Sequence, residues 1–162
     1  PVGVVDETIL RWIGHRMQRL VQQKAGVEGV RSLHTMTDSP PGKIFHAAVS
    51  QQDRVTILTV GGELDVSTVR DLAAISRPAA ASVDAGLIVD LSEVQFLSSS
   101  AITELVRTFE HLPPHTEMAL VATTGVVVRP VRLSGIDRVM STFDNITAAA
   151  EHIMDRTESP TA

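Results

Sequence analysis

The sequence has no cysteine and no tyrosine, and only one tryptophan and four phenylalanines among its 162 residues. Without cysteine the chain can form neither a disulfide framework, nor a zinc ribbon, nor a thiol nucleophile. The scarcity of aromatic side chains leaves valine, leucine, isoleucine and alanine to fill the core. The lack of cysteine fits a reducing compartment, so we expect a cytoplasmic protein.

Long hydrophobic runs and an excess of basic charge are also missing. No apolar run approaches the ~20 residues that span a bilayer, and no secretory hydrophobic segment opens the sequence, so we expect no membrane partner. The formal net charge is −5. Binding to nucleic acid through its phosphates normally needs a basic face, so we expect no nucleic-acid partner either. A chain of this length suits one domain with an ordinary core and an appendage.

The residue patterns of several enzyme classes are absent as well. No Gly-x-Ser-x-Gly elbow occurs, and no histidine and carboxylate can be assigned to Ser100 as base and orienting group. His111 and His115 bracket a Pro-Pro turn without an evident third ligand, which indicates exposed loop histidines rather than a metal site. No glycine-rich loop that could hold phosphates is present. We therefore predict a protein that is not an enzyme and that has no cofactor and no metal.

The first part of the chain has the pattern of an amphipathic helix. In residues 6–25 the apolar side chains, Trp12 among them, recur on one helical face, and the arginines lie away from it. Residues 26–43 have the glycine and proline content of a linker. We predict an extension over residues 1–35, a globular domain over residues 44–155 and a frayed tail over residues 156–162. The apolar stripe of the extension could cover the domain or form a homodimer.

The globular part alternates apolar strands with helical periodicity in the order ββαβαβαβα, which predicts a mixed sheet of four to five strands backed by about four helices. We expect the Gly61-Gly62 pair to break the second strand and Asp65 to cap the first helix of the domain. Pro78 is expected to end that helix, because proline lacks the backbone N–H. Gly135 and Asn145 have the character of a helix stop and a helix cap, respectively. Residues 139–143 are predicted as the last strand.

The stretch from Gly86 to Phe109 organises the domain. It contains an apolar strand at Leu87–Leu91, an expected turn at Ser92–Gln95, and three consecutive serines at residues 98–100. Ile102, Leu105, Val106 and Phe109 then recur with the spacing of one helical face. The serines thus stand at the start of a helix, where a hydroxyl can accept from unpaired backbone N–H groups and where added negative charge is stabilised. On the residues alone, cap and turn chemistry explains them.

The same stretch resembles the signature of the STAS domains, the anti-sigma factor antagonists of bacteria. Asp90-Leu91 and Phe96-Leu97 match the family pattern, and Ser98-Ser99-Ser100-Ala101 stands where Asp-Ser-Ser-Gly is expected. The segments Gly62-Glu63-Leu64-Asp65 and Leu133-Ser134-Gly135-Ile136 also resemble the family, so that the resemblance covers about residues 44–154. Two positions depart from it, since Ser98 replaces the motif's aspartate and Ala101 its glycine.

The resemblance implies a function in which the chemistry belongs to a partner. In this family a kinase that inhibits a sigma factor phosphorylates the second serine of the motif, and that position is Ser100 here, with Ser99 and Ser98 as the alternatives. It also implies that Glu63, Asp65, Ser98, Ser99, Ser100 and Ala101 contact this anti-sigma factor. Two other roles stay open: an unphosphorylated scaffold or regulatory STAS protein of a larger signalling assembly, and a small-ligand-binding or lipid-binding module.

Overall fold

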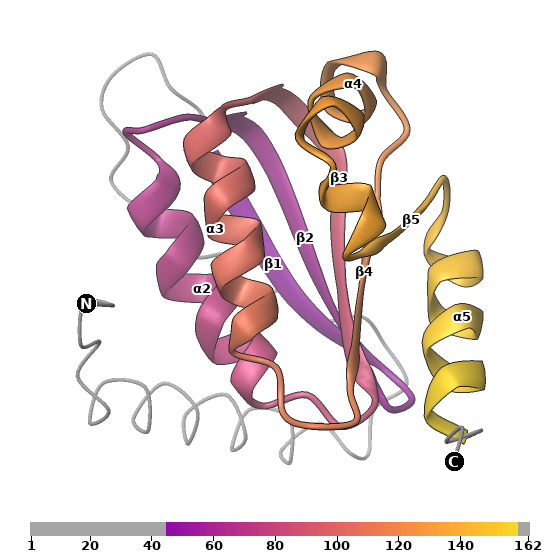
Figure 1. Ribbon diagram of the computed structural model, residues 1–162. Helices are drawn as coiled ribbons and strands as arrows, with labels where there is room; N and C mark the ends of the chain where they lie inside the picture. Colours follow the sequence, from indigo (N-terminus) through magenta and orange to yellow (C-terminus); the bar gives the residue numbers. More distant parts are fainter. Residues whose placement is uncertain (1–44, 159–162) are drawn as a thin grey trace.

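The computed structural model describes residues 45–158 (Figure 1). The elements follow the predicted order and are β1 (Phe45–Gln52), β2 (Val55–Leu64), α2 (Val69–Ala81), β3 (Gly86–Leu97), α3 (Ser99–Glu110), β4 (Glu117–Val121), α4 (Gly125–Ser134), a short 3-10 helix η1 (Ile136–Arg138), β5 (Ser141–Phe143) and α5 (Ile146–Glu158). The predicted helix in residues 6–25, its linker, and any dimer that it forms lie outside the described residues. Among the residues described, no helix is long and apolar enough to cross a membrane.

The five strands form one mixed sheet in the order β1-β2-β3-β4-β5. The hairpin of β1 and β2 is antiparallel, whereas β2, β3, β4 and β5 pair in parallel. Strand β3 is central, and its residues Leu87–Leu91 are buried on both faces, as expected of a continuous apolar run. The prediction of a four- to five-strand mixed sheet with a central strand at residues 87–91 is therefore confirmed.

Helices cover the two faces of the sheet unequally. Helices α2, α3 and α4 share one face, and α2 and α3 run side by side (Figure 1). Leu105 of α3 is fully buried in the core on this side, which confirms the predicted inner face of that helix. The other face carries a smaller core that includes Ile88 and Ile153 and is covered by α5. The site described below depends on the first of these layers.

Strands β2 and β3 are both longer than predicted. The expected break at Gly61-Gly62 and the expected turn at Ser92–Gln95 are wrong, because both segments continue as strands. Register shifts between Thr59 and Gly61, and between Gly62 and Glu63, absorb the extra residues of β3 as bulges. Gly62 has φ of 90°, a conformation that favours glycine, so the glycine serves the bulge rather than ending the strand.

Proline ends neither of the helices in which it lies. Pro78 is inside α2, so the prediction that it stops this helix is wrong, and Pro130 is inside α4 beyond the first turn. Each proline leaves one carbonyl four residues earlier without its helical N–H partner. These carbonyls belong to Ala74 and Val126, which are both exposed, so water can satisfy them.

The end of the domain follows the predicted signals with one change. Gly135 ends α4 in the left-handed conformation with φ of 77°, and the Asn145 side chain accepts a hydrogen bond of 2.8 Å from the backbone N–H of Ala148 in α5. The last strand is shorter than the predicted residues 139–143, since only Ser141–Phe143 pair with β4. The residues before it include η1 at Ile136–Arg138. Helix α5 reaches Glu158, past the expected start of the frayed tail at residue 156.

Candidate functional site

The candidate site lies at the edge of the sheet where the parallel strands end. The carboxyl end of β2 leads into the loop before α2, and the carboxyl end of β3 leads into the serines that begin α3. The two connections are joined directly, because the backbone N–H of Ser98 donates to the carbonyl of Leu64 over 2.8 Å. Two segments more than thirty residues apart in sequence therefore form one surface.

The three serines have three different environments. Ser98 is the N-cap of α3, and its Oγ accepts from the backbone N–H of Ala101 at 3.2 Å. Ser99 is exposed at the first helical position. Ser100 is half-buried, and no hydrogen bond of its hydroxyl occurs within the described part of the chain. Ser98 thus performs the capping that an aspartate would perform at the same position, and Ser100 keeps its hydroxyl available.

The loop before α2 is organised by Asp65 and Thr68. The Asp65 carboxylate accepts from the backbone N–H of Ser67 at 2.8 Å and from its hydroxyl at 2.6 Å. The buried Thr68 hydroxyl donates to the Glu63 carbonyl at 2.7 Å. The N-cap of α2 is Thr68, so the prediction that Asp65 caps this helix is wrong. Its carboxylate instead holds the turn, in the way that aspartate side chains compete for local backbone N–H groups.

The structure brings only part of the predicted partner contact together. Ser98, Ser99 and Ser100 lie beside the Asp65 loop at the same sheet edge. Glu63 precedes Leu64, which belongs to the core under α3, so alternation along β2 directs the Glu63 side chain to the opposite face. Ala101 is fully buried, and its methyl packs in the core rather than on the surface. The Ala101 side chain is therefore part of the core and not of the exposed surface at this edge.

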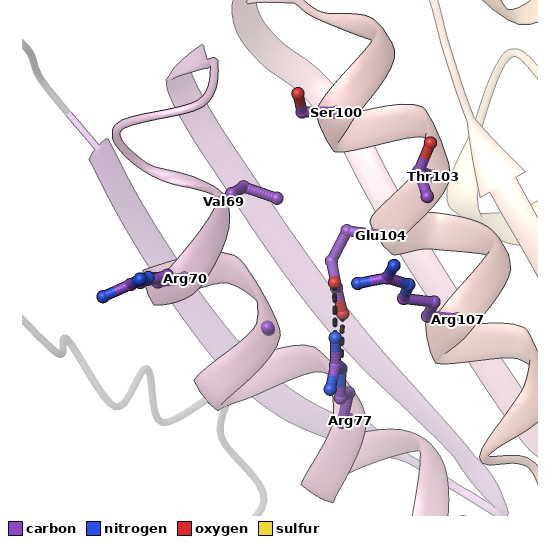
Figure 2. Close-up of a pocket in the computed structure, with 8 residues that line it drawn as sticks. Val69, Arg70, Arg77, Ser100, Thr103, Glu104 and Arg107 are labelled. Carbon is purple, nitrogen blue, oxygen red and sulfur yellow. Dashed lines mark hydrogen bonds and ion pairs between the residues drawn. The ribbon is translucent and has the colours of Figure 1, made fainter. Parts of the chain in front are cut away.

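A groove between α2 and α3 opens beside Ser100. It has a volume of about 390 Å³ and is lined by Val69, Arg70, Ala73, Arg77, Ser100, Thr103, Glu104 and Arg107. Figure 2 shows the Arg77 guanidinium facing the Glu104 carboxylate across the groove, with two hydrogen bonds of 2.6 and 2.7 Å. These bonds raise the pKa of Arg77 above its ordinary value. The Arg77–Glu104 ion pair therefore spans the groove, and Ser100 lies at one end of it.

The sequence pattern did not predict that two large apolar side chains near this edge, Val66 and Phe96, are exposed. Val66 is 75% exposed in the loop before α2, and Phe96 is 51% exposed near the end of β3, in register with Glu63 of β2. Val66 follows Asp65 directly in the loop, so it belongs to the surface beside the serines. Phe96 lies on the side of β3 opposite Leu97, whose side chain is buried in the core under α3.

Other chemistry is not assembled in the described part of the molecule. His111 lies with Nδ1 2.7 Å from the carbonyl oxygen of Arg107, and His115 is an exposed loop residue with φ of 66°. No group of three potential metal-ligating side chains occurs in residues 45–158. The described residues form a surface that places the Ser100 hydroxyl at a helix start, between an ordered loop and a groove lined by arginines.

Comparison with known proteins agrees with this architecture. The model of the STAS domain matches residues 46–149. The anti-sigma-F factor antagonist RsfB of Mycobacterium tuberculosis is 31% identical over 98 residues, which are 60% of this chain and 80% of that protein. A crystal structure of an anti-sigma factor antagonist from Mycobacterium paratuberculosis is 29% identical, covers 72% of this chain and 99% of its own, and superposes with a TM-score of 0.67.

More distant structures share the fold alone. The unphosphorylated anti-sigma factor antagonist SpoIIAA is 17% identical, covers 67% of this chain and 96% of its own, and gives a TM-score of 0.57. The five-strand mixed sheet with its helices is the fold of that group, and the serine-bearing helix start lies at its carboxyl edge. The chain belongs to the STAS domain family.

Proposed function

We propose that this protein is an anti-sigma factor antagonist: it binds the inhibitor of a sigma factor through the edge that carries Ser98–Ser100 and so frees the sigma factor for transcription. We propose further that the inhibitor is a serine kinase and that phosphorylation of Ser100 by this kinase ends the binding. The protein supplies the surface and the acceptor hydroxyl, and the partner supplies the catalysis. Such a function places the protein in the bacterial cytoplasm.

The observation that carries the proposal is the position of Ser100. Its hydroxyl stands at the second residue of α3 and makes no hydrogen bond within residues 45–158, while Ser98 already provides the cap. The Asp65 loop lies beside it and carries the exposed Val66, so a partner that covers this edge also covers Ser100. The similarity to the two mycobacterial antagonists supports the class of partner.

A phosphate at Ser100 would act on the surface rather than on the fold. It would add about −1.5 to −2 charges. At the N-terminus of a helix this charge is stabilised by the macrodipole and by the free N–H groups, so the domain should keep its structure. In a fitted interface, however, the same group adds bulk, repels acidic neighbours and costs desolvation, so binding should weaken.

The test is incubation of the full chain with ATP and the anti-sigma-F factor of M. tuberculosis, followed by mass mapping of phosphoserine and by a binding titration. We expect one phosphate at Ser100 in the wild type and none in Ser100→Ala. Ser100→Asp should bind the partner at least tenfold more weakly with an unchanged melting temperature, whereas Ser100→Ala should bind and resist release.

Ser99→Ala is the matched control, because Ser99 is exposed one residue away and makes no cap. Ser98→Asp restores the motif's carboxylate and should increase phosphorylation if that carboxylate assists recognition. Equal phosphorylation and equal binding of the wild type, Ser100→Ala and Ser100→Asp would refute the switch. Binding without any phosphorylation would instead support the scaffold role that the sequence left open.

A further inference from the structure

We infer that the groove between α2 and α3 receives an acidic side chain of the protein partner that binds at the Ser100 edge. The inference rests on the proposed function and extends its surface from the serines along the two helices. Ser100, Thr103 and Arg107 follow one another along one face of α3, and all three line the groove. A partner seated on Ser100 therefore lies at the mouth of this groove.

The charges of the groove are unbalanced toward the positive sign. Three arginines line it against a single glutamate. Both carboxylate oxygens of Glu104 are taken by Arg77, and the Glu104 side chain is only 3% exposed. Figure 2 shows Arg107 reaching from α3 toward Glu104 and Arg70 extending outward from α2. Neither Arg107 nor Arg70 makes a side-chain ion pair within residues 45–158.

The excess of positive charge in the groove is opposite in sign to the formal net charge of the whole chain, which is −5. An exposed guanidinium beside a groove is suited to a carboxylate, because its planar N–H groups can donate two parallel hydrogen bonds. Charge complementarity of this kind fixes register and raises the rate of association. Six of the eight residues that line the groove are charged or polar, so a charged side chain fits it better than an apolar anchor.

The same charges explain how a modification at one end could control the whole groove. Ser100 and Arg107 are seven residues apart on α3, which is roughly 10 Å along the helix axis. A phosphate on Ser100 would bring negative charge to the mouth of the groove, where it would repel an approaching carboxylate and attract the arginines. The phosphate and the acidic side chain of the partner would then compete for one positive field.

The experiment uses Arg107→Glu in the full chain, with Arg129→Glu as the matched control. Both arginines are exposed helical residues, but Arg129 lies on α4 outside the groove. The probes are the anti-sigma-F factor of M. tuberculosis and, independently, a hexaglutamate peptide followed by NMR shifts of backbone amides and arginine Nε–H groups. Melting temperatures verify that both variants are folded.

We expect Arg107→Glu to bind the anti-sigma-F factor at least tenfold more weakly and Arg129→Glu to stay within twofold of the wild type. Equal affinities of the two variants would overturn the inference while leaving the proposed function intact. If the wild type does not bind the anti-sigma-F factor, the proposed function fails for that partner. The hexaglutamate peptide then tests by itself whether the groove binds an acidic ligand. NMR shifts that are confined to residues of the groove and are lost in Arg107→Glu support binding of an acidic ligand there. If the peptide causes no shifts, or the same shifts in Arg107→Glu, the inference is overturned.

Discussion

At the scale of single residues, neighbouring identical side chains do different work. Ser98 closes the first turn of α3 through its hydroxyl, Ser99 faces solvent, and Ser100 lines the groove. The difference arises from backbone geometry, because Ser98 has the extended conformation of an N-cap and Ser99 is the first helical residue. The cap of α3 and the proposed phosphorylation site therefore belong to separate serines.

Ser98→Ala should therefore lower the free energy of unfolding by about 0.5–2 kcal/mol, because it removes the acceptor of the Ala101 N–H. Ser100→Ala should change it by less, since its hydroxyl caps nothing. Urea denaturation followed by circular dichroism measures both variants. A larger loss for Ser100→Ala than for Ser98→Ala would contradict the assignment of the cap.

Leu105→Ala should be among the most costly truncations in α3. Leu105 is fully buried on the side of α3 that faces the sheet. Truncation of its side chain therefore leaves a cavity and also loses the transfer free energy of the removed atoms. We expect a decrease of about 2–5 kcal/mol in the free energy of unfolding. Thr103→Ala, on the exposed side of the same helix, is the control, and equal effects of the two substitutions would show that the inner face is misassigned.

At the scale of elements, a polar bridge joins the two helices that border the groove. The Arg77–Glu104 pair is supported by a hydrogen bond of 2.8 Å between the hydroxyls of Ser76 and Thr108, and both hydroxyls are buried. Neither contact follows from an amphipathic pattern, which only directs polar residues outward. Together they fix how α2 lies against α3 and hence the width of the groove.

Arg77→Ala should destabilise the domain by about 3 kcal/mol, because it leaves the buried Glu104 carboxylate without its partner. The double variant Arg77→Ala/Glu104→Gln should recover part of this loss, since no unpaired charge is then buried. Chemical denaturation of the two single variants and the double variant gives the coupling free energy. Strictly additive losses would show that the pair does not hold the helices together.

At the scale of the whole molecule, the described domain has its own complete sheet and a core on each face of it. Deletion of residues 1–35 should therefore leave cooperative unfolding intact, as followed by circular dichroism in urea. Loss of cooperativity would show that the extension belongs to the folding unit.

Trp12 is the only tryptophan, so its emission maximum in the full chain reports whether the predicted helix is packed. Light scattering of both forms tests the predicted homodimer.

The sequence by itself determined the order of elements, the central strand at residues 87–91, the inner face of α3 and the ends marked by Gly135 and Asn145. These features depend on apolar periodicity and on capping chemistry, which act over a few residues. The resemblance also made the serine segment the candidate site before any geometry was known.

Only the tertiary structure decided the bulges of β3, the placement of two prolines inside helices and the groove beside Ser100. The bulges exist because β2 continues to pair with β3, and the prolines are tolerated because the carbonyls that they leave free belong to exposed residues. The groove combines side chains of α2 and α3, whose packing depends on contacts between residues about thirty positions apart. Local pattern has no information on such contacts, because they arise only when two amphipathic faces bury against the same sheet.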